Sequence, residues 1–576
     1  MTLEDRVVSR LYSRLEKLYG DRAAGVTDRL LDVLYREPMN PHPVPASRWD
    51  ERDIVLITYG DQLRQGDSPT LPVLGSFLQE TELDRLINTI HILPFYPYSS
   101  DDGFSVIDYR RVDPAIGDWT DVTRLGKQTS LMFDLVLNHT SRESDWFRAY
   151  RAGEEPYTRF FIESEPDVDW SQVTRPRNTP LLTPQQTTRG PRYNWTTFSE
   201  DQVDLNFAEP EVLLEFIDIL MFYFRQGARI IRLDAIAFLW KQPGTSCIHL
   251  PQTHEVVKLI RDVVDAVAPH VILLTETNVP HEENISYFGA GDEAHMVYQF
   301  SLPPLLLDAL LNEDAAPLTK WLSDFPETPG GTTFFNFTAS HDGVGVRPLE
   351  GLVPHARIER LVEAAKARGG RVSTRRLADG NESPYELNIT YFDALADLDS
   401  APTPSRLRRF LASQAIMLAI RGIPGVYFHS LFGTRNDHDS VRQSGQSRRI
   451  NRSKFAVDDL MKSLKDFGST TRQVFDAYRH LLRSRIAQKA FHPDGAQRVY
   501  QISNDQLLCF ERSSPDDQQR ILVVANLGSV RQLLDLDRLG CTARRDLLSV
   551  TRLESLQQIS LDPWQVAWLE IDGPSK

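Results

Sequence analysis

The sequence has only three cysteines in 576 residues, and their spacing indicates neither a disulfide framework nor a zinc site. Basic residues are also in the minority, with 64 Lys and Arg against 79 Asp and Glu and a net charge of −15. Nucleic-acid binding depends on clustered cations that neutralise phosphates, so this balance argues against a nucleic-acid partner.

Long apolar runs are missing as well. No stretch approaches the roughly 18 to 20 residues of a membrane span. Residues 1–6 carry acids where a signal peptide would carry an apolar segment. We therefore expect a cytoplasmic protein without a membrane partner. No dense group of oxygen ligands indicates calcium, and neither a metal nor an organic cofactor is expected.

Three short apolar runs each end in a carboxylate, at Asp234, Glu276 and Asp342. Such a run is typical of a parallel strand that is buried on both faces and carries a functional group at its carboxyl end. Several carboxylates around one small polar substrate suit glycosidic bond cleavage, which needs a nucleophile or base, an acid and an electrostatic stabiliser.

Five further apolar runs bring the number of candidate strands to eight. They occupy residues 54–59, 90–95, 131–136, 229–234, 271–276, 296–300, 333–342 and 424–428. Eight strands separated by helical segments predict a fold of the α/β class, a (β/α)8 barrel.

The rest of the chain is expected to form appendages, because 576 residues exceed one compact core. Apolar residues at helical spacing precede a Pro-rich stretch at 38–45. The gaps after the third and the seventh candidate strand are too long for ordinary barrel connections. After residue 490, short runs alternate between apolar and polar residues. The expected parts are an N-terminal helical extension (1–50), the barrel (51–139 and 206–488), an inserted domain after the third strand (140–205), a loop subdomain after the seventh strand (343–400) and a C-terminal antiparallel β domain (489–576).

The residues beside the three acids refine their chemistry. Arg232 precedes Asp234 by two positions, so both side chains point to the same side of a strand, and the guanidinium would keep the carboxylate ionised. Glu276 follows an apolar run that could raise its pKa towards the value of a general acid. The plainer alternatives are an ion pair that fills the barrel and an exposed Glu at a strand end.

Five short motifs in this order resemble the signature regions of the α-amylase superfamily, glycoside hydrolase family 13. They are Asp-Asp-Gly-Phe at 101–104, Val-Leu-Asn-His at 136–139, Ile-Arg-Leu-Asp at 231–234, Thr-Glu at 275–276 and Ser-His-Asp at 340–342. The resemblance runs from about residue 53 to the C-terminus and implies a (β/α)8 barrel with an inserted domain and a C-terminal β domain. It implies that Asp234 is the nucleophile, Glu276 the acid/base and Asp342 the stabiliser of the transition state. The implied glucosyl-binding residues are Asp101, Phe104, His139, Arg232, His341 and Arg448.

A narrower resemblance is to the sucrose phosphorylase branch of that family. This resemblance rests on residues 91–95, 175–177, 244–247, 300–307 and 448–452. The resemblance implies that Arg177 and Tyr385 bind inorganic phosphate as a co-substrate, and the fork of an Arg matches phosphate geometry. Without the resemblance, a solvated loop charge is the plainer interpretation of Arg177.

The sequence differs from the sucrose phosphorylase branch at one position of the acceptor site. This chain has Glu386 where the branch carries a Gln next to the Tyr, which implies a different acceptor site. Residues 99–109, 275–280 and 287–292 look most like the glucosylglycerate phosphorylases of the branch. A carboxylate acceptor needs cations, whereas Glu386 would repel it, so glucosylglycerol phosphorylases are a rival. The candidate cations are Arg177, Arg347, Arg375 and Arg376, and the candidate apolar walls are Phe238 and Trp195.

The resemblance thus predicts a retaining α-glucoside phosphorylase that works through a β-glucosyl-enzyme: 2-O-α-glucosylglycerate + phosphate ⇌ α-D-glucose 1-phosphate + glycerate. Alternatives within the branch are glucosylglycerol, sucrose and sucrose 6-phosphate phosphorylases. A hydrolase or transglucosidase of the same fold, or a barrel that only binds, stays open. The expected partners are the small-molecule glucoside and phosphate, and the oligomeric state is left undecided, with a homodimer as one option.

Overall fold

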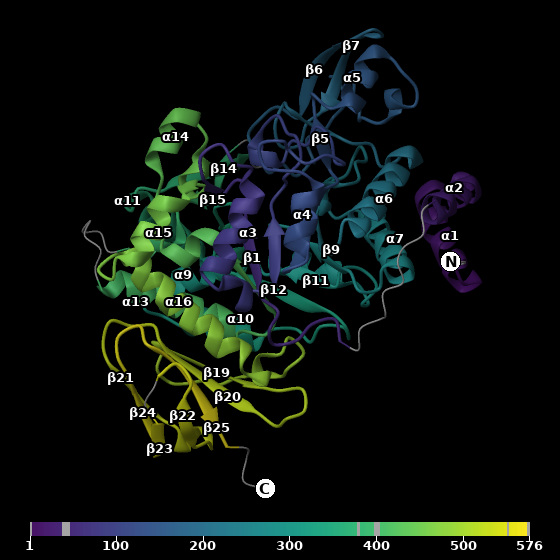
Figure 1. The fold of residues 1–576 in the computed structure, drawn as a ribbon. Coiled ribbons are helices and arrows are strands. Elements are labelled where there is room, and N and C mark those ends of the chain that lie inside the picture. The colour runs from purple at the N-terminus through teal and green to yellow at the C-terminus, as the bar shows by residue number, and fades with distance from the viewer. Residues whose placement is uncertain (1–2, 37–46, 377–380, 397–403, 550–551, 573–576) are drawn as a thin grey trace.

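The computed structural model describes residues 3–36, 47–376, 381–396, 404–549 and 552–572 (Figure 1). The Pro-rich stretch 38–45 lies outside these residues. Within them, no helix is long and apolar enough to cross a membrane. The same part of the chain contains no group of three or more His, Cys, Asp or Glu residues that could hold a metal ion.

All eight runs expected as strands form one closed parallel barrel, so the predicted fold is confirmed. The strands are β1 (Val55–Thr58), β3 (Thr89–Ile92), β4 (Ser130–Val136), β9 (Ala228–Asp234), β10 (Ile272–Thr275), β11 (Met296–Tyr298), β12 (Thr333–Phe337) and β16 (Ile423–Tyr427). Their order around the barrel is β1-β16-β12-β11-β10-β9-β4-β3. Nearly every side chain in them is buried, which explains why the sequence shows continuous apolar runs there.

Helices alternate with the strands and cover the outside of the barrel (Figure 1). They include α3 (Thr70–Glu80), α4 (Trp119–Gly126), α6 (Pro210–Arg225), α7 (Pro251–Val267), α9 (Leu302–Asn312), α13 (Pro404–Ala419) and α16 (Thr470–Ile486). Local sequence fixes where several of them begin. Asp118 caps α4 and forms a capping box with Asp121, while α6 and α7 begin with a proline, which needs no hydrogen-bond acceptor there.

Two long connections lie at one end of the barrel (Figure 1). The connection between β4 and β9 contains α5 (Asp145–Ala152), the hairpin β6 (Leu182–Thr187) with β7 (Gly190–Trp195), and the pair β5 (His139–Ser141) with β8 (Gln202–Asp204). The connection after β12 contains α11 (His355–Ala367) and a three-stranded sheet in the order β13 (Val344–Gly345), β15 (Glu382–Asn388), β14 (Arg371–Arg376). Because all barrel strands run in parallel, their carboxyl ends share this end of the barrel.

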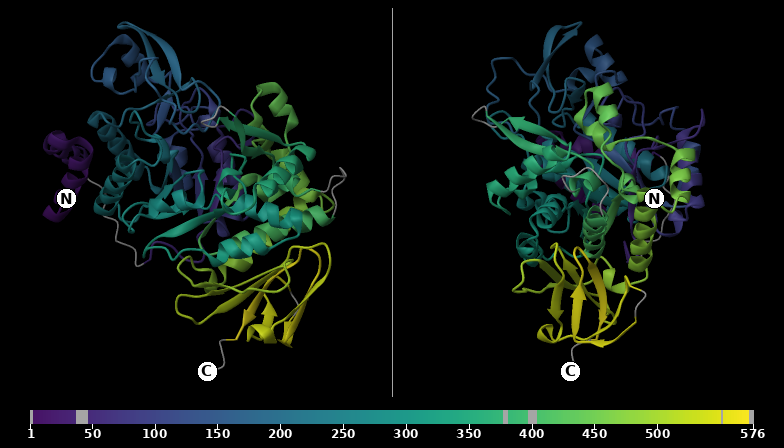
Figure 2. Two further views of the ribbon diagram at one scale, coloured as in Figure 1. Left: turned by 180° about the vertical axis from the view of Figure 1, so that it is seen from behind. Right: turned by 90° about the vertical axis from the view of Figure 1, so that its left-hand side faces the viewer.

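The C-terminal part is an antiparallel β domain at the opposite end of the barrel (Figure 2). Its main sheet has the order β18 (Gln497–Val499), β19 (Leu507–Ser513), β20 (Arg520–Asn526), β25 (Val566–Ile571), β22 (Ala543–Asp546), β23 (Arg552–Leu556), and β21 (Gln532–Asp535) pairs with β24 (Gln558–Leu561). Arg512 is buried at the junction and donates to the carbonyl oxygen of Ala419 at 2.9 Å. This domain therefore stays remote from the carboxyl ends of the strands.

The N-terminal helices α1 (Asp5–Tyr19) and α2 (Ala23–Tyr35) pack on the outside of the barrel beside α6 and α7 (Figure 1). Arg14 of α1 forms ion pairs with Glu255, Asp262 and Asp292, at 3.1 to 3.3 Å. The hydroxyl of Tyr19 donates to the carbonyl oxygen of Phe207 at 3.0 Å. The extension is thus fixed to the barrel wall and does not reach the strand ends.

Candidate active site

A cavity of about 630 Å³ opens among the loops that follow the barrel strands. A volume of this size suits a small polar ligand. Eleven residues that the sequence marked as candidates line it: Asp101, Phe104, His139, Arg177, Asp234, Phe238, Glu276, His341, Asp342, Tyr385 and Arg448. The carboxyl ends of distant strands are therefore gathered around one space, as the barrel fold requires.

Strand β9 holds Asp234 in place through Arg232. The guanidinium donates from Nη1 to Oδ1 of Asp234 at 2.6 Å, which agrees with the two-residue spacing. The same nitrogen contacts Asp134 of β4, and Nε2 of His91 lies 2.6 Å from the other oxygen of Asp134. Arg232 was expected to bind the glucosyl group, but it is buried and does not line the cavity; it contacts Asp234 instead.

Glu276 lies directly after β10, beside the same guanidinium. Its Oε2 is 3.9 Å from Nη2 of Arg232 and accepts a hydrogen bond of 3.0 Å from the backbone N–H of Ala235. Burial raises the pKa of Glu276 and of Asp234, the charge of Arg232 opposes both rises, and nearby carboxylates reinforce them. Because Arg232 contacts Asp234 far more closely, we assign the negative charge to Asp234 and the proton to Glu276.

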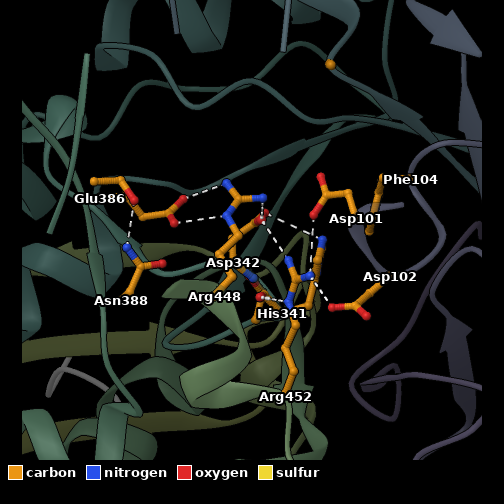
Figure 3. Close-up of polar contacts among 12 residues, drawn as sticks. Asp101, Asp102, Phe104, His341, Asp342, Glu386, Asn388, Arg448 and Arg452 are labelled. Carbon is orange, nitrogen blue, oxygen red and sulfur yellow. Dashed lines mark hydrogen bonds and ion pairs between the residues drawn. The ribbon is translucent and has the colours of Figure 1, made fainter. Parts of the chain in front are cut away.

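The surroundings of Asp342 lower its pKa, in contrast to those of Asp234 and Glu276. Burial alone would raise its pKa, but Arg448 at 2.6 Å, together with Arg452, lowers the pKa well below its usual value. Figure 3 shows Arg448 between Asp342 and Glu386. Asp342 therefore stays ionised at neutral pH, as a group that stabilises positive charge must.

Gly343 allows the strand β15 to approach this loop. A Cβ atom added there would lie 2.4 Å from the carbonyl oxygen of Leu387, so only glycine fits between the catalytic loop and β15.

One side of the cavity is built from aromatic rings and from imidazoles held by hydrogen bonds. Phe104 stacks on His341 with 4.7 Å between ring centroids and 3° between planes. Nε2 of His139 lies 2.9 Å from the carbonyl oxygen of Phe104 and 3.1 Å from Nε2 of Gln202. Burial lowers the pKa of both His139 and His341, so both imidazoles are neutral at neutral pH.

Arg177 from the β4–β9 connection lies over the ring of Tyr385 of β15, and both residues line the cavity. Its guanidinium lies 5.4 Å from the ring centre of Tyr385 and 5.9 Å from that of Phe198. Among the described residues, no carboxylate lies within ion-pair distance of Arg177. The cavity therefore contains a cation whose charge is not balanced by a nearby carboxylate.

Two further cations lie near Tyr385. Nη2 of Arg347 is 3.4 Å from Glu283, and Nη2 of Arg375 is 2.7 Å from Glu350. Burial lowers the pKa of Arg347, and so does the charge of Arg375, which is therefore close by. Neither residue lines the cavity itself, and Arg376, the remaining candidate cation, is exposed at the end of β14.

Two expected acceptor contacts need correction. Glu386 is fully buried, and its carboxylate accepts from Nε and Nη2 of Arg448 at 3.0 and 2.7 Å, so it faces the interior instead of an acceptor. Trp195 is also buried, packs at 4.7 Å against Trp170 and donates to Thr197, so it is a core residue of the inserted segment. Neither side chain lines the cavity.

Sequence reasoning missed several residues of this site. Phe198, Gln202 and Asn278 line the cavity, and Asp134 anchors Arg232. Asp134 could have been found, because it is a charged residue inside an otherwise apolar strand. Phe198 and Gln202 lie in the inserted segment without a periodic pattern, so no local signal distinguishes them.

Comparisons with known proteins agree with this geometry. Residues 83–321 match the family model described as "Alpha amylase, catalytic domain". A glucosylglycerate phosphorylase of Spirochaeta thermophila is 47% identical over 91% of this chain and 90% of its own length. One of Escherichia coli is 44% identical over 91% of this chain and 92% of its own.

A solved structure has the same architecture. Sucrose 6F-phosphate phosphorylase from Thermoanaerobacter thermosaccharolyticum superimposes with a TM-score of 0.73 at 25% identity, covering 84% of this chain and 96% of that one. The barrel, the carboxylates at the ends of its strands and the identity to full-length relatives lead to one assignment. The chain belongs to the glucosylglycerate phosphorylase family, within the α-amylase superfamily (glycoside hydrolase family 13).

Proposed function

We propose that this protein is a retaining phosphorylase of 2-O-α-glucosylglycerate, with α-D-glucose 1-phosphate and glycerate as products. The identity to relatives of that name over nine-tenths of the chain supports the substrate. Within the site, the observation that carries the proposal is the uncompensated guanidinium of Arg177 beside the catalytic carboxylates, because such a cation suits an anionic co-substrate better than water.

The first half-reaction uses the charge distribution of the three acids. Asp234, ionised and aimed by Arg232, attacks the anomeric carbon. Glu276 gives its proton to the leaving oxygen of glycerate, and ionised Asp342 stabilises the positive charge that develops on the sugar. The product is a β-glucosyl ester of Asp234 and free glycerate.

The second half-reaction replaces glycerate by phosphate. Glu276, now ionised, takes a proton from phosphate while a phosphate oxygen attacks the anomeric carbon and releases Asp234. Arg177 and Tyr385 would hold the phosphate at the cavity mouth, with two parallel N–H donors of the guanidinium. Two inversions leave the α configuration unchanged.

We assign the acceptor carboxylate to Arg347 and Arg375, two cations near Tyr385 from which it would displace Glu283 and Glu350. The burial of Glu386 supports this assignment. Its charge is balanced by Arg448, so the repulsion of glycerate that the sequence suggested is absent. A negatively charged acceptor can replace these glutamates as the partner of the two cations, whereas glycerol cannot, so the charged acceptor is favoured.

The deciding experiment supplies 2-O-α-glucosylglycerate and saturating phosphate to the purified protein. We expect α-D-glucose 1-phosphate, with the anomeric configuration assigned by proton NMR. Accumulation of glucose instead would replace the proposal by a hydrolase. In the synthetic direction, glucose 1-phosphate is offered with glycerate, glycerol, fructose or fructose 6-phosphate, and a preference for any acceptor other than glycerate would overturn the substrate assignment.

We also propose a cytoplasmic location for the enzyme. All three cysteines are buried and free, which suits a reducing compartment. Fractionation of cells that express the protein, followed by activity assays of each fraction, tests the location.

A further inference from the structure

The turn that carries Asp101 has an unusual backbone. Asp101 and Asp102 both have φ of 51°, and Gly103 follows with φ of 113°. Left-handed conformations of non-glycine residues cost free energy, because the Cβ atom comes close to the backbone. Two such residues in succession persist only if neighbouring groups hold them.

Two arginines from another part of the chain contact this turn. Arg449 lies in the 3-10 helix η9 (Ser447–Asn451), and Arg452 directly follows it. Nη1 of Arg452 is 2.8 Å from Oδ2 of Asp102, while Arg449 contacts the other oxygen. The side chains of Asp102 and Arg452 are almost completely buried, so water screens this pair little (Figure 3).

Arg452 also contacts the catalytic loop after β12. Its Nε donates to the carbonyl oxygen of His341 at 2.8 Å, and its Nη2 lies 4.0 Å from the carboxylate of Asp342. On its other side Nη1 is 3.4 Å from Asp101. One buried guanidinium therefore connects the loop after β3 with the loop after β12, as Figure 3 shows.

Asp101 and Asp102 differ in exposure and in their ion pairs, so they can have different roles. Asp101 lines the cavity and its side chain is 32% exposed, whereas Asp102 turns away and is paired twice. The arginine pair balances the charge of the aspartate pair. Asp102 thus has no access to a ligand, but it can fix the turn from which Asp101 extends.

We propose that Arg452, through Asp102, is a positioning residue that aims the carboxylate of Asp101 at the glucosyl group. This inference rests on the proposed function for the nature of the bound sugar. The competing explanation is that the pair only stabilises the fold, so the test must separate orientation of Asp101 from general stability.

The probe is α-D-glucosyl fluoride, which carries the glucosyl group but no acceptor. Release of fluoride is measured with the full-length protein and the variants Asp102→Asn and Arg452→Lys. Asn tolerates the left-handed backbone but lacks the charge, and Lys keeps a charge but not the fork. Each change is also made in an Asp101→Ala background.

We expect Asp102→Asn to lower kcat/KM for the fluoride at least about tenfold in the native background and less than about threefold in the Asp101→Ala background, because coupled residues are not additive. Arg452→Lys also changes the contacts with His341 and Asp342, so its loss should be smaller in the Asp101→Ala background than in the native one without disappearing. A purely structural role would lower both backgrounds by the same factor. Equal losses, or a loss below about threefold in the native background, would overturn the inference.

The matched control is Arg357→Lys. Arg357 of α11 pairs with buried Asp308 of α9 at 2.6 Å and does not line the cavity. We expect kcat/KM for the fluoride to be unchanged in this variant at a temperature where it is folded. Thermal unfolding followed by circular dichroism confirms that every variant is folded during the assay.

Failure of this inference differs from failure of the proposed function. The native protein tests the proposed function by its products from glucosylglycerate and phosphate. The comparison of backgrounds tests only Arg452 and Asp102. If the native protein released glucose instead of glucose 1-phosphate, the fluoride assay would still decide the inference about Asp101.

Discussion

Arg448 holds Glu386 through two hydrogen bonds of 3.0 and 2.7 Å while its remaining Nη atom lies 2.6 Å from Asp342. The residue beside the phosphate candidate Tyr385 is thereby linked to the group that stabilises the transition state. Glu386 should consequently affect the chemical step more than the binding of the acceptor.

Glu386→Gln is the direct test of that link. The variant loses one charged acceptor, so Arg448 is held less firmly and Asp342 is oriented less well. We expect kcat to fall at least about tenfold, with the KM for glycerate changed less than about twofold. Initial rates of synthesis at varied glycerate measure both constants.

Glu382→Gln is the matched control, because Glu382 is exposed near the start of the same strand β15. It should leave both constants unchanged. A large rise in the KM for glycerate with kcat preserved in Glu386→Gln would instead indicate direct contact with the acceptor.

The roles of Asp234 and Glu276 can be separated with two donors. Fluoride leaves without protonation, so Glu276→Gln should lose at least about 100-fold in kcat/KM with glucosylglycerate but much less with α-D-glucosyl fluoride. Asp234→Asn removes the nucleophile and should abolish the reaction of both donors. Equal losses of Glu276→Gln with the two donors would contradict its role as the acid.

The pH dependence of kcat/KM should report the shared proton. Burial raises the pKa of Glu276, and the protonated form is the active one in phosphorolysis, so activity falls as pH rises through this raised value. Asp234 must be ionised, so activity also falls as pH decreases through its own raised pKa. Because Asp234 and Glu276 interact, the acidic and alkaline limbs of the pH profile report the titration of the pair and not of either residue alone.

With the fluoride as donor, the alkaline limb should disappear, because cleavage then needs no acid. Persistence of that limb with the fluoride would assign it to a group other than Glu276. Rates measured with both donors over the same buffers provide the comparison.

The barrel and the position of three carboxylates around one cavity could be predicted because they depend on local pattern. A strand that is buried on both faces must be apolar, and a carboxylate at its end is conspicuous, as at Asp234. The neighbours of Glu386 could not be predicted in this way. Its partner Arg448 is 62 positions away, and Arg452 is 350 positions from Asp102.

The inserted segment shows the same limit. Trp195 is an aromatic residue of a type that often contacts sugars, yet it packs against Trp170. Phe198, three residues later, lines the cavity. Which of two nearby aromatic residues faces a ligand depends on how β7 pairs with β6 and on the path of the chain after β7, neither of which the sequence pattern specifies.

Arg177→Ala should impair the phosphate half-reaction specifically. Without its guanidinium, the KM for phosphate should rise at least about tenfold, and water should intercept more of the glucosyl-enzyme. The ratio of glucose to glucose 1-phosphate at fixed phosphate measures this partition. Arg192→Ala is the control: Arg192 on β7 is half-buried, is paired with Glu163 and does not line the cavity, so the ratio should be unchanged.

Arg347→Ala should distinguish the two anions that the site binds in turn. If Arg347 binds the carboxylate of the acceptor, the KM for glycerate in synthesis should rise at least about tenfold while the slower reaction with glycerol is unaffected. Arg376→Ala, which removes an exposed cation from β14, should change neither acceptor. A rise in the KM for phosphate without a change for glycerate would place Arg347 in the phosphate site. Arg375 would then be the remaining anchor of the acceptor, because it is the other partly buried guanidinium near Tyr385.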